Sequence, residues 1–543
     1  MVANVVERTN NSRTILIILL VCVLTFLLSY FFYESSEQAY ERGMAYQKER
    51  DTERAIRAYK KAILLNPRNA LAHYELGWSY WVQERWPDVV THWQKAKALN
   101  LKNPLLSDYL NQAINYAAGK YKKLKRVPIG TYARSKNGSL TIELIARYQR
   151  YNPKPVAETD FYDETIRSPK SVQFHPSNNK VYVNALEAEK TLIFSPLDLR
   201  KTNQIEHDFD ESNAYLFSQP KKKTAWPTFP KSIRQPNIFS GKPVEQTFSP
   251  DGKLLWVPYY RRSFDRYSRY PSALALIDVA SEKIIRVFDT GPIPKYVTAS
   301  PDGKWLAVTH WGDNTVGLIK TIGKPENYKR DRIFVVEKKM NLNDIKSTDR
   351  DHGCGFCLRG AVFSKDSRYL FVARMGGGGI AIIDIKQSKY LGSVFGMPPT
   401  PRHLLLSNDG KQLFLSSNHN GSVSKYNTVD LIQAVKQGQK ELEPLAKTTT
   451  GPLTRTISLS PDGEVIFAAV NKESKIVALD AETLHILLEI DADSYPVGMD
   501  ISPDGSQLWV TAQGRRGRGG NSVMVYRVDH QSHRIRRDQV AVQ

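Results

Sequence analysis

The sequence predicts a multidomain protein with an N-terminal transmembrane helix, an all-α helical-repeat module and an all-β propeller of seven blades. Three observations predict this fold class: an apolar run at residues 15–33, a repeat with a period of 34 residues directly after it, and a β-type unit that recurs from about residue 170 onward. A chain of 543 residues with 41 % hydrophobic content has room for several domains and a large core.

The apolar run at residues 15–33, ILIILLVCVLTFLLSYFFY, contains no charged residue. As a helix that rises about 1.5 Å per residue, it would reach roughly 28 Å, close to the hydrocarbon thickness of a bilayer. Arg8 and Arg13 precede the run and two glutamates follow it, which favours a cytoplasmic N-terminus. We therefore expect a tail at residues 1–14, a single-pass helix in the inner (cytoplasmic) membrane, and a body in the periplasm or another extracytoplasmic space.

The 34-residue repeat occupies residues 36–120 and matches the tetratricopeptide (TPR) pattern of two-helix hairpins. Small residues let the two helices of a hairpin approach closely, and aromatic side chains fill the space between hairpins. The run LLSDYLNQAINYAAGKY then resembles a closing helix. We expect two repeats plus a capping helix that together dock a protein partner. The predicted packing residues are Gly43, Tyr46, Ala55, Tyr59, Gly77, Tyr80 and Trp93.

A β-type unit recurs seven times within residues 166–535, in copies such as LSPDGEVIFAAVNKESKIVALD. Each copy has an apolar strand, a Ser-Pro-Asp-Gly turn, a second strand, a polar turn and a third strand, and several add a fourth. Proline presets the first corner of the turn, and glycine takes its left-handed exit. Seven such units describe a closed propeller. Residues 121–165 are expected to form a basic linker with possible ring-closing strands.

The recurring unit resembles the repeat of the YVTN family of bacterial propellers. The segment 300–320, SPDGKWLAVTHWGDNTVGLIK, is similar to that repeat nearly throughout, and the resemblance covers about two thirds of the chain. It implies a seven-bladed propeller. The first blade and the insertions at residues 207–243 and 321–352 depart from the pattern, and the missing Gly-His and Trp-Asp signatures argue against a WD40 propeller.

The formal net charge of +21 favours an anionic partner, and a solubilising surface is the alternative. The loops that enter the inner strands share one face of a propeller, and five inner strands begin with a cation seven residues before the turn aspartate or its equivalent. Guanidinium groups suit carboxylate, phosphate or sulfate. The predicted binding residues of this basic face are Lys170, Arg261, Arg262, Lys295, His310, Trp311, Arg359, Arg374, Arg402, Arg455, Arg515 and Arg516.

The loop DHGCGFCLRG contains His352, Cys354 and Cys357. These are three potential metal ligands where a closed structural zinc site has four. Leu358 stands where a c-type haem motif requires histidine, and the cysteines precede a strand, unlike a thioredoxin-like dithiol at a helix start. A disulfide or inert thiols, a metal site and redox chemistry remain open. No cofactor is otherwise expected.

Together these features predict a membrane-anchored interaction or scaffold protein of a bacterial envelope. In this interpretation the TPR module docks a protein, and the propeller binds an anionic polymer or an acidic protein. One alternative is a propeller-fold lyase or hydrolase on an anionic substrate at the channel mouth, with His310, His403 or His419 as acid or base. A further alternative is a metal or redox site at the cysteine loop. No catalytic triad stands out, so no catalytic residue is assigned, and the sequence favours a non-enzymatic role.

Overall fold

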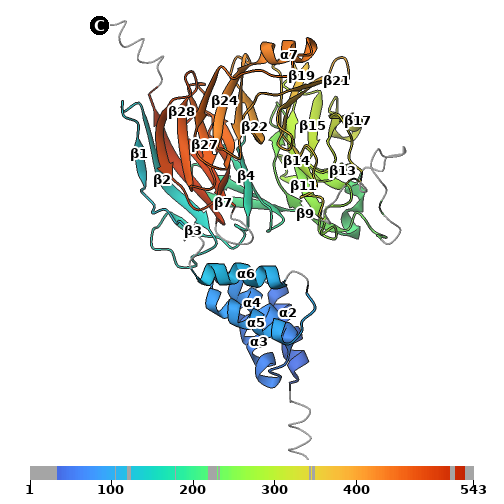
Figure 1. Cartoon of the computed structure of the whole chain (residues 1–543), viewed down its shortest axis with the longest axis vertical. Coiled ribbons are helices and arrows are strands. Elements are labelled where there is room, and N and C mark those ends of the chain that lie inside the picture. Colours follow the sequence, from blue (N-terminus) through green and yellow to red (C-terminus); the bar gives the residue numbers. More distant parts are fainter. Residues whose placement is uncertain are drawn as a thin grey trace, which may run out of the picture. The chain divides into compact units, whose positions relative to one another are not determined.

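The computed structural model describes residues 34–49, 51–103, 106–118, 124–177, 179–217, 229, 233–341, 344, 349–513 and 520–531. The chain divides into two compact units, residues 1–123 and 124–543. Within the described ranges, no helix is both long and apolar enough to cross a membrane. The predicted fold class is therefore corrected to a helical unit plus a propeller (Figure 1), and the predicted transmembrane helix at residues 15–33 lies outside the described residues.

The described part of the first unit contains two helical hairpins and a closing helix. Its helices are α2 (Ser36–Lys48), α3 (Thr52–Leu65), α4 (Ala70–Val82), α5 (Trp86–Ala98) and α6 (Leu106–Ala117). Ser35 and Gln38 form a capping box at the start of α2, and the side chains of Asp51 and Asn69 cap α3 and α4. Each cap satisfies a backbone N–H that the helix itself leaves unpaired.

Gly43 and Gly77 let the two helices of each hairpin pack closely. A Cβ atom at Gly43 would lie 2.4 Å from the ring of Tyr59, and one at Gly77 would lie 2.2 Å from the ring of Trp93. Both aromatic rings are fully buried. The remaining predicted packing residues, Ala55, Tyr80 and the partly buried Tyr46, belong to the same core.

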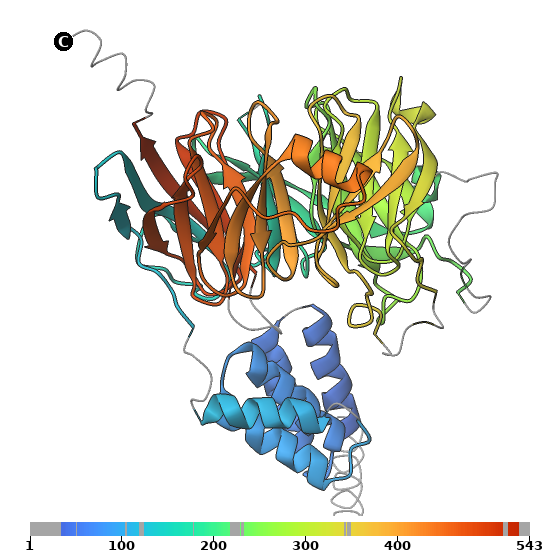
Figure 2. The ribbon, with the colours of Figure 1, turned by 45° about the horizontal axis from the view of Figure 1, so that its top comes forward.

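The described part of the second unit contains seven β-sheets that form the blades of a propeller (Figures 1 and 2). The first blade contains β4 (Pro169–Phe174), β5 (Val181–Ala185), β6 (Lys190–Ser195) and β7 (Arg200–Glu206), and the second contains β10 (Thr247–Phe248), β11 (Leu254–Arg262), β12 (Ser272–Asp278) and β13 (Lys283–Thr290), with β8 (Asp208–Phe209) and β9 (Phe239–Pro243) added. The third blade contains β14 (Pro294–Ala299), β15 (Trp305–His310), β16 (Thr315–Lys320) and β17 (Lys329–Val335), and the fourth contains β18 (Leu358–Phe363), β19 (Tyr369–Arg374), β20 (Ile380–Asp384) and β21 (Lys389–Val394). The fifth blade contains β22 (Pro401–Leu406), β23 (Gln412–Ser417), β24 (Ser422–Asn427) and β25 (Ala446–Thr449), and the sixth contains β26 (Thr454–Leu459), β27 (Val465–Val470), β28 (Lys475–Asp480) and β29 (Ile486–Asp491). Helix α7 (Thr428–Lys436) lies between β24 and β25 in sequence.

The seventh blade joins the two ends of the propeller chain. It contains β30 (Pro496–Ile501), β31 (Gln507–Ala512), β32 (Ser522–His530), β2 (Leu140–Gln149), β1 (Tyr132–Arg134) and β3 (Asp160–Tyr162). Strand β2 pairs antiparallel with β32, and Figure 2 shows the teal N-terminal strands beside the red C-terminal ones. Residues 124–165 thus belong to the propeller. Buried Arg147 on β2 fixes this junction through ion pairs with Asp160 and with Asp493, the latter at 3.2 Å.

The Ser-Pro-Asp-Gly turns are held by the same local hydrogen bonds in successive blades. In the third blade, the hydroxyl of Ser300 donates to Asp302 Oδ1 at 2.6 Å and accepts from the backbone N–H of Trp305 at 3.0 Å. Gly303 takes the left-handed conformation at φ +69°. These contacts explain why the four turn residues recur together in the sequence.

We predict that replacing Gly77 by leucine unfolds the helical unit but not the propeller. The new side chain would collide with Trp93, and overpacking of this kind costs about 3 kcal/mol or more. Thermal unfolding followed at 222 nm should lose the helical transition and keep the propeller transition. Ala45→Leu, which places the same side chain on an exposed position of α2, is the control. Loss of the propeller transition in Gly77→Leu would contradict the division into two independent units.

Candidate anion site at the mouth of the propeller channel

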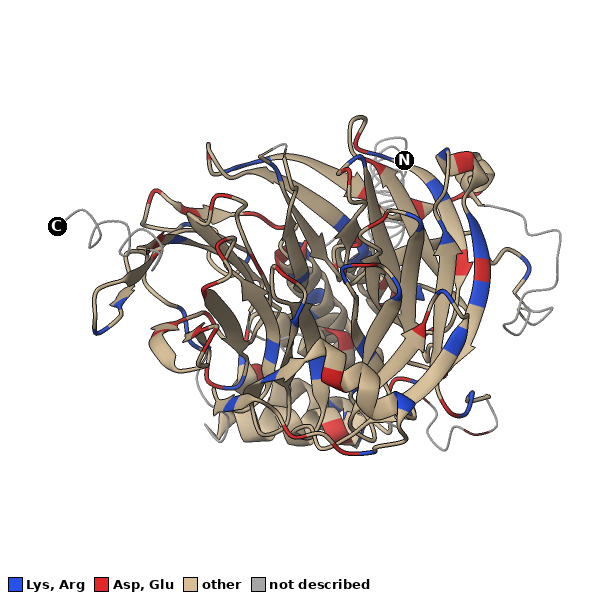
Figure 3. Cartoon of the chain, turned by 90° about the horizontal axis from the view of Figure 1, so that it is seen from above, with Lys and Arg blue, Asp and Glu red and all other residues tan. Residues whose placement is uncertain are grey.

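Five inner strands carry a cation at their second residue. We call these five side chains the cationic ring: Lys170 on β4, Lys295 on β14, Arg359 on β18, Arg402 on β22 and Arg455 on β26. The inner strands of a propeller surround one channel, so residues at the same strand position share one level of it. In Figure 3, basic residues lie on strands at the centre of the propeller as well as at its periphery.

The members of the cationic ring lie close enough to perturb one another's ionisation. Burial, and then Arg359 and Arg402, hold the pKa of Lys170 well below its usual range. Burial lowers the pKa of Lys295 to about 8. Asp351 favours the charged form of this lysine, and Arg359 and Arg402 disfavour it. The ring is therefore a concentration of mutually repelling charges in a poorly solvated place.

Two carboxylates offset part of this charge. Arg359 donates to Glu245 Oε1 at 2.7 Å, and the ammonium group of Lys295 lies 3.1 Å from Asp351. Lys170 donates to the amide oxygen of Gln513 at 3.2 Å, a neutral acceptor. Positive charge therefore exceeds negative charge among the residues that the structure describes at the mouth.

Arg402 has no hydrogen bond or ion pair from its guanidinium group to any described residue, although the residue is only 5 % exposed. Burial, and then Arg455 and Arg359, hold its pKa well below the usual range, against the weaker attraction of Glu245. Burying an ion without a partner costs several kcal/mol. A guanidinium group in this state is an open receptor for a carboxylate or phosphate oxygen, which would supply both charge and hydrogen-bond acceptors.

A cavity of about 340 Å³ lies in the channel. Its lining includes Ser171, Gln173, Tyr296, His403, Ser458 and Asp500, which follow the ring positions along the inner strands. Glu245, the partner of Arg359, also lines this cavity. The cationic ring and the cavity are therefore neighbouring parts of one site.

The cavity contains two ionisable groups in unusual states. His403 Nδ1 faces the backbone N–H of Ile457 at 3.5 Å and accepts from it, so Nε2 carries the proton and donates to the hydroxyl of Tyr296 at 3.0 Å. Burial lowers the pKa of His403 to about 4 and raises the pKa of Asp500 to about 7. At neutral pH the imidazole is uncharged, and the carboxyl group of Asp500 is near its titration midpoint.

Arg262 and Arg374, both predicted on the basic face, have packing roles instead. Arg262 donates to Asp289 at 2.5 Å and packs over aromatic rings within its blade. Arg374 donates to Glu337 at 2.6 Å and covers another aromatic ring. Both residues end the second strand of a blade, where the side chain turns into the sheet packing rather than toward the channel.

His310 is a structural residue in the third blade. Its Nε2 lies 2.6 Å from the hydroxyl of Thr290, its Nδ1 lies 2.8 Å from the hydroxyl of Thr315, and the side chain is fully buried. Burial lowers its pKa to about 3. Because its ring nitrogens are held by the protein, His310 is not available as the acid or base that the sequence suggested.

Of the other predicted residues within the described ranges, only Trp311 contacts the cationic ring, its aromatic ring lying 5.2 Å from Lys295 Nζ. Arg261 is partly exposed and donates to a backbone carbonyl on its own loop, and Trp311 donates to the backbone carbonyl of Asp351 at 3.1 Å. His419 is exposed on the turn after β23. Arg515 and Arg516 lie outside the described residues.

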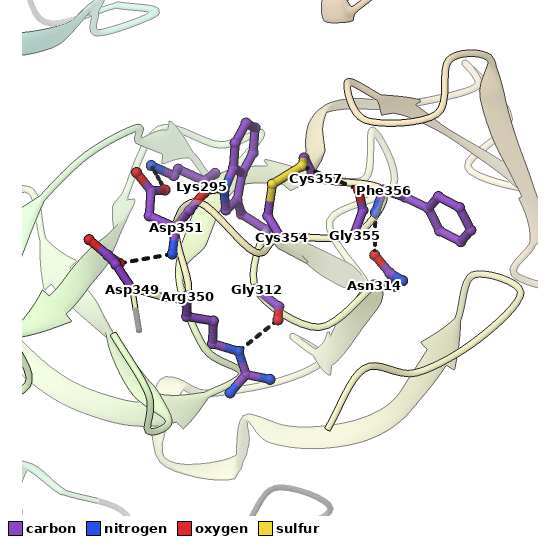
Figure 4. The surroundings of a disulfide bond; sticks show 11 residues. Lys295, Gly312, Asn314, Asp349, Arg350, Asp351, Cys354, Gly355, Phe356 and Cys357 are labelled. Carbon is purple, nitrogen blue, oxygen red and sulfur yellow. Dashed lines mark hydrogen bonds and ion pairs between the residues drawn. A yellow bond between two sulfur atoms is a disulfide. The ribbon is translucent and has the colours of Figure 1, made fainter. Parts of the chain in front are cut away.

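Figure 4 shows the loop with Cys354 and Cys357, which are joined by a disulfide with their Cα atoms 4.9 Å apart. Disulfide sulfurs are not thiolates, so in this state the loop does not offer the cysteine ligands of a metal site. The side chain of His352 is 76 % exposed and lies 3.7 Å from Asp349. Asp351 in the same loop pairs with Lys295 of the cationic ring, so the disulfide loop forms part of the mouth.

Sequence reasoning missed Glu245 and Asp500. Glu245 lies six residues before the turn aspartate of its blade, one position beyond the cations, and Asp500 lies four residues before Asp504. Aligning the inner strands for acidic as well as basic residues would have placed both on the channel, because inner strands share one register relative to their turns.

The structure defines a repeat protein with two parts, a stack of helical hairpins and a seven-bladed propeller with a cationic mouth. Residues 272–543, half of the chain, match the family described as "Lactonase, 7-bladed beta-propeller". The chain belongs to this family. Residues 43–84 match the TPR repeat. Propellers and TPR repeats generally mediate interactions between proteins.

One curated relative is Antigen Lp49 of Leptospira interrogans serogroup Icterohaemorrhagiae serovar copenhageni (strain Fiocruz L1-130), which is 25 % identical over 248 residues. The match covers 42 % of this chain and 50 % of the antigen, so the chain spans about half the length of this relative. Similar solved structures include Kuenenia stuttgartiensis hydrazine synthase (13 % identity, 70 % of this chain, 99 % of that chain, TM-score 0.48) and the Cps50 (Swd1) β-propeller domain of Myceliophteria thermophila (10 %, 66 %, 96 %, TM-score 0.48). Likenesses of this strength say nothing about ligand or activity.

We predict that Arg402→Met stabilises the propeller in a buffer without multivalent anions. The change removes a buried charge that has no protein partner and keeps much of the side-chain volume, and replacing buried ions by apolar groups gains up to about 4 kcal/mol. Arg147→Met is the matched control, because it leaves the buried carboxylates of Asp160 and Asp493 without their cationic partner and should cost about 3–5 kcal/mol. Calorimetric unfolding of both variants measures this. Equal destabilisation would mean that Arg402 has a partner in the free protein.

Proposed function

We propose that this protein is an interaction scaffold whose propeller binds an anionic ligand at the cationic ring while its helical hairpins dock a protein partner. The observation that carries the proposal is the buried guanidinium group of Arg402, which no described residue pairs. The expected ligand is an acidic protein or anionic polymer that presents a carboxylate or phosphate group to the mouth.

The burial of the ring indicates how such a ligand would bind. The Lys170, Arg359 and Arg402 residues are all less than 10 % exposed, so an anion reaches them only by inserting a group into the mouth. An ion pair formed there is screened less by water and salt than one on an open surface. One inserted end or side chain, rather than a flat charged face, is therefore the element that the ring would recognise.

The helical unit supports the second half of the proposal. Its two hairpins and closing helix form a short module, and repeats of this kind present side chains on a continuous surface for a partner. Together with the ring, the module would bring a protein and an anionic ligand to one chain. A pull-down with wild-type protein and with Gly77→Leu would identify partners that need the helical unit, and identical sets would contradict its docking role.

We also propose that the propeller works in an oxidising compartment such as the periplasm. The disulfide between Cys354 and Cys357 supports this location, because disulfides persist in oxidising compartments and are rare in the cytosol. Thiol labelling of freshly lysed cells should find both cysteines protected until a reductant is added. Free thiols at both positions would contradict the location.

A second candidate function is catalysis on an anionic substrate in the channel. It is favoured by Asp500, which lines the cavity below the ring and whose pKa of about 7 lets it exchange a proton at neutral pH. In this alternative, the ring would bind the substrate's charge and Asp500 would act as acid or base. Turnover that disappears in Asp500→Asn would favour the enzyme over the scaffold.

We predict that binding of a hexaglutamate peptide depends on the position of positive charge rather than on its amount. Arg402→Gln combined with Arg455→Gln should weaken binding at least tenfold, and wild-type binding should fall steeply as salt rises. The control Lys253→Gln with Lys411→Gln removes the same charge from turns where these side chains are 80 % and 79 % exposed. It should change the affinity less than twofold. Equal losses, measured by fluorescence anisotropy, would mean that the +21 charge acts diffusely.

A further inference from the structure

Below the cationic ring, the described residues that line the channel cavity include carboxyl groups but no lysine or arginine. From this change we infer that the propeller selects zwitterionic ligands, with an anionic group at the ring and an ammonium group bound deeper in the channel at Asp500. The inference rests on the proposed function, because the ring binds the anionic end. It adds the chemical class of the ligand, an amino-acid-like molecule whose two charges are separated by several bonds.

The strand register sets the distance between the two ends. Ring members occupy the second residue of their inner strands, and Asp500 occupies the fifth residue of β30. A strand rises about 3.3 Å per residue and these inner strands have a bulge near their start, so Asp500 lies roughly 7–10 Å farther along the channel than the ring. The cavity of about 340 Å³ has the size of small-molecule sites.

The deeper wall is rich in hydrogen-bond acceptors. Asp500 Oδ2 accepts from the backbone N–H of Phe174 at 2.8 Å and Oδ1 from the hydroxyl of Ser458 at 3.5 Å, and a carboxylate can accept further bonds. Gln246 is 9 % exposed, and its amide nitrogen donates to the backbone carbonyl of Tyr182 at 2.6 Å, which fixes the amide's orientation. Gln246 and Gln173 both line the cavity, and the Oε1 atom of each is buried without a hydrogen-bond partner among the described residues. A small rotation of either amide would present this acceptor to a ligand that donates.

The charged groups on the cavity wall have the sign that an ammonium group needs. The described residues that line it include the carboxyl groups of Glu245 and Asp500, the neutral His403, and no lysine or arginine. Glu245 is already paired with Arg359. Asp500 is therefore the carboxyl group that can receive a cation. Burial raises its pKa to about 7, and a bound ammonium group would favour its ionised form.

The test uses three probes of equal chain length with the full chain: 6-aminohexanoate, hexanoate and adipate. Isothermal titration calorimetry should find 6-aminohexanoate bound at least tenfold more tightly than the other two, because its ammonium group reaches the acceptor-rich wall. Arg402→Gln should weaken all three. Asp500→Asn should remove the preference for 6-aminohexanoate, whereas Asp529→Asn, the same change on the exposed side of β32, should keep it.

The outcomes separate this inference from the proposed function. If the three probes bind equally and still depend on Arg402, the zwitterion inference is overturned and the anion site stands. If none binds in an Arg402-dependent way, both are overturned. Should Asp500→Asn fail to fold, the comparison of the three probes on the wild-type protein still decides the matter.

Discussion

Seven inner strands surround one channel. Residues at the same position in different strands therefore lie beside one another at the mouth of the channel. This constraint turns a feature of single blades, a cation at the second residue of an inner strand, into the cationic ring. The ring is costly to the free protein, because its members repel one another and are poorly hydrated. Glu245 and Asp351 relieve Arg359 and Lys295, and Arg402 is left without a protein partner among the described residues. Sites that give up stability in this way are commonly functional.

Other buried arginines of the propeller show that the fold is able to pair such groups. Arg147 joins Asp160 and Asp493 where the ring of blades closes, and Arg262 reaches Asp289 within the second blade. These ion pairs hold strands and loops in place. This contrast favours a ligand-binding role for Arg402. Arginines that are about equally buried are paired where they support the structure, whereas Arg402 is unpaired where a ligand can enter.

Local patterns made most of the fold predictable. A glycine under an aromatic ring recurs after 34 residues, as Gly43 and Gly77 show, and the hydrogen bonds of each turn lie within a few residues of one another. The site was only half predictable. Register alone aligned the ring cations, but whether Arg374 points to the channel or into its own sheet depends on packing between blades. Asp500 follows no repeat, and the cysteine pairing depends on a Cα distance that spacing does not give.

The central claim is that the mouth of the propeller is an anion receptor built around Arg402. The most direct measurement is an anomalous difference map from propeller crystals soaked in sodium bromide, because bromide is a small anion whose position such a map reveals. The account predicts a bromide peak within hydrogen-bond distance of the Arg402 guanidinium group, and no such peak in crystals of Arg402→Met. A mouth without bromide, in which Arg402 donates to a protein carbonyl or carboxylate, would contradict it.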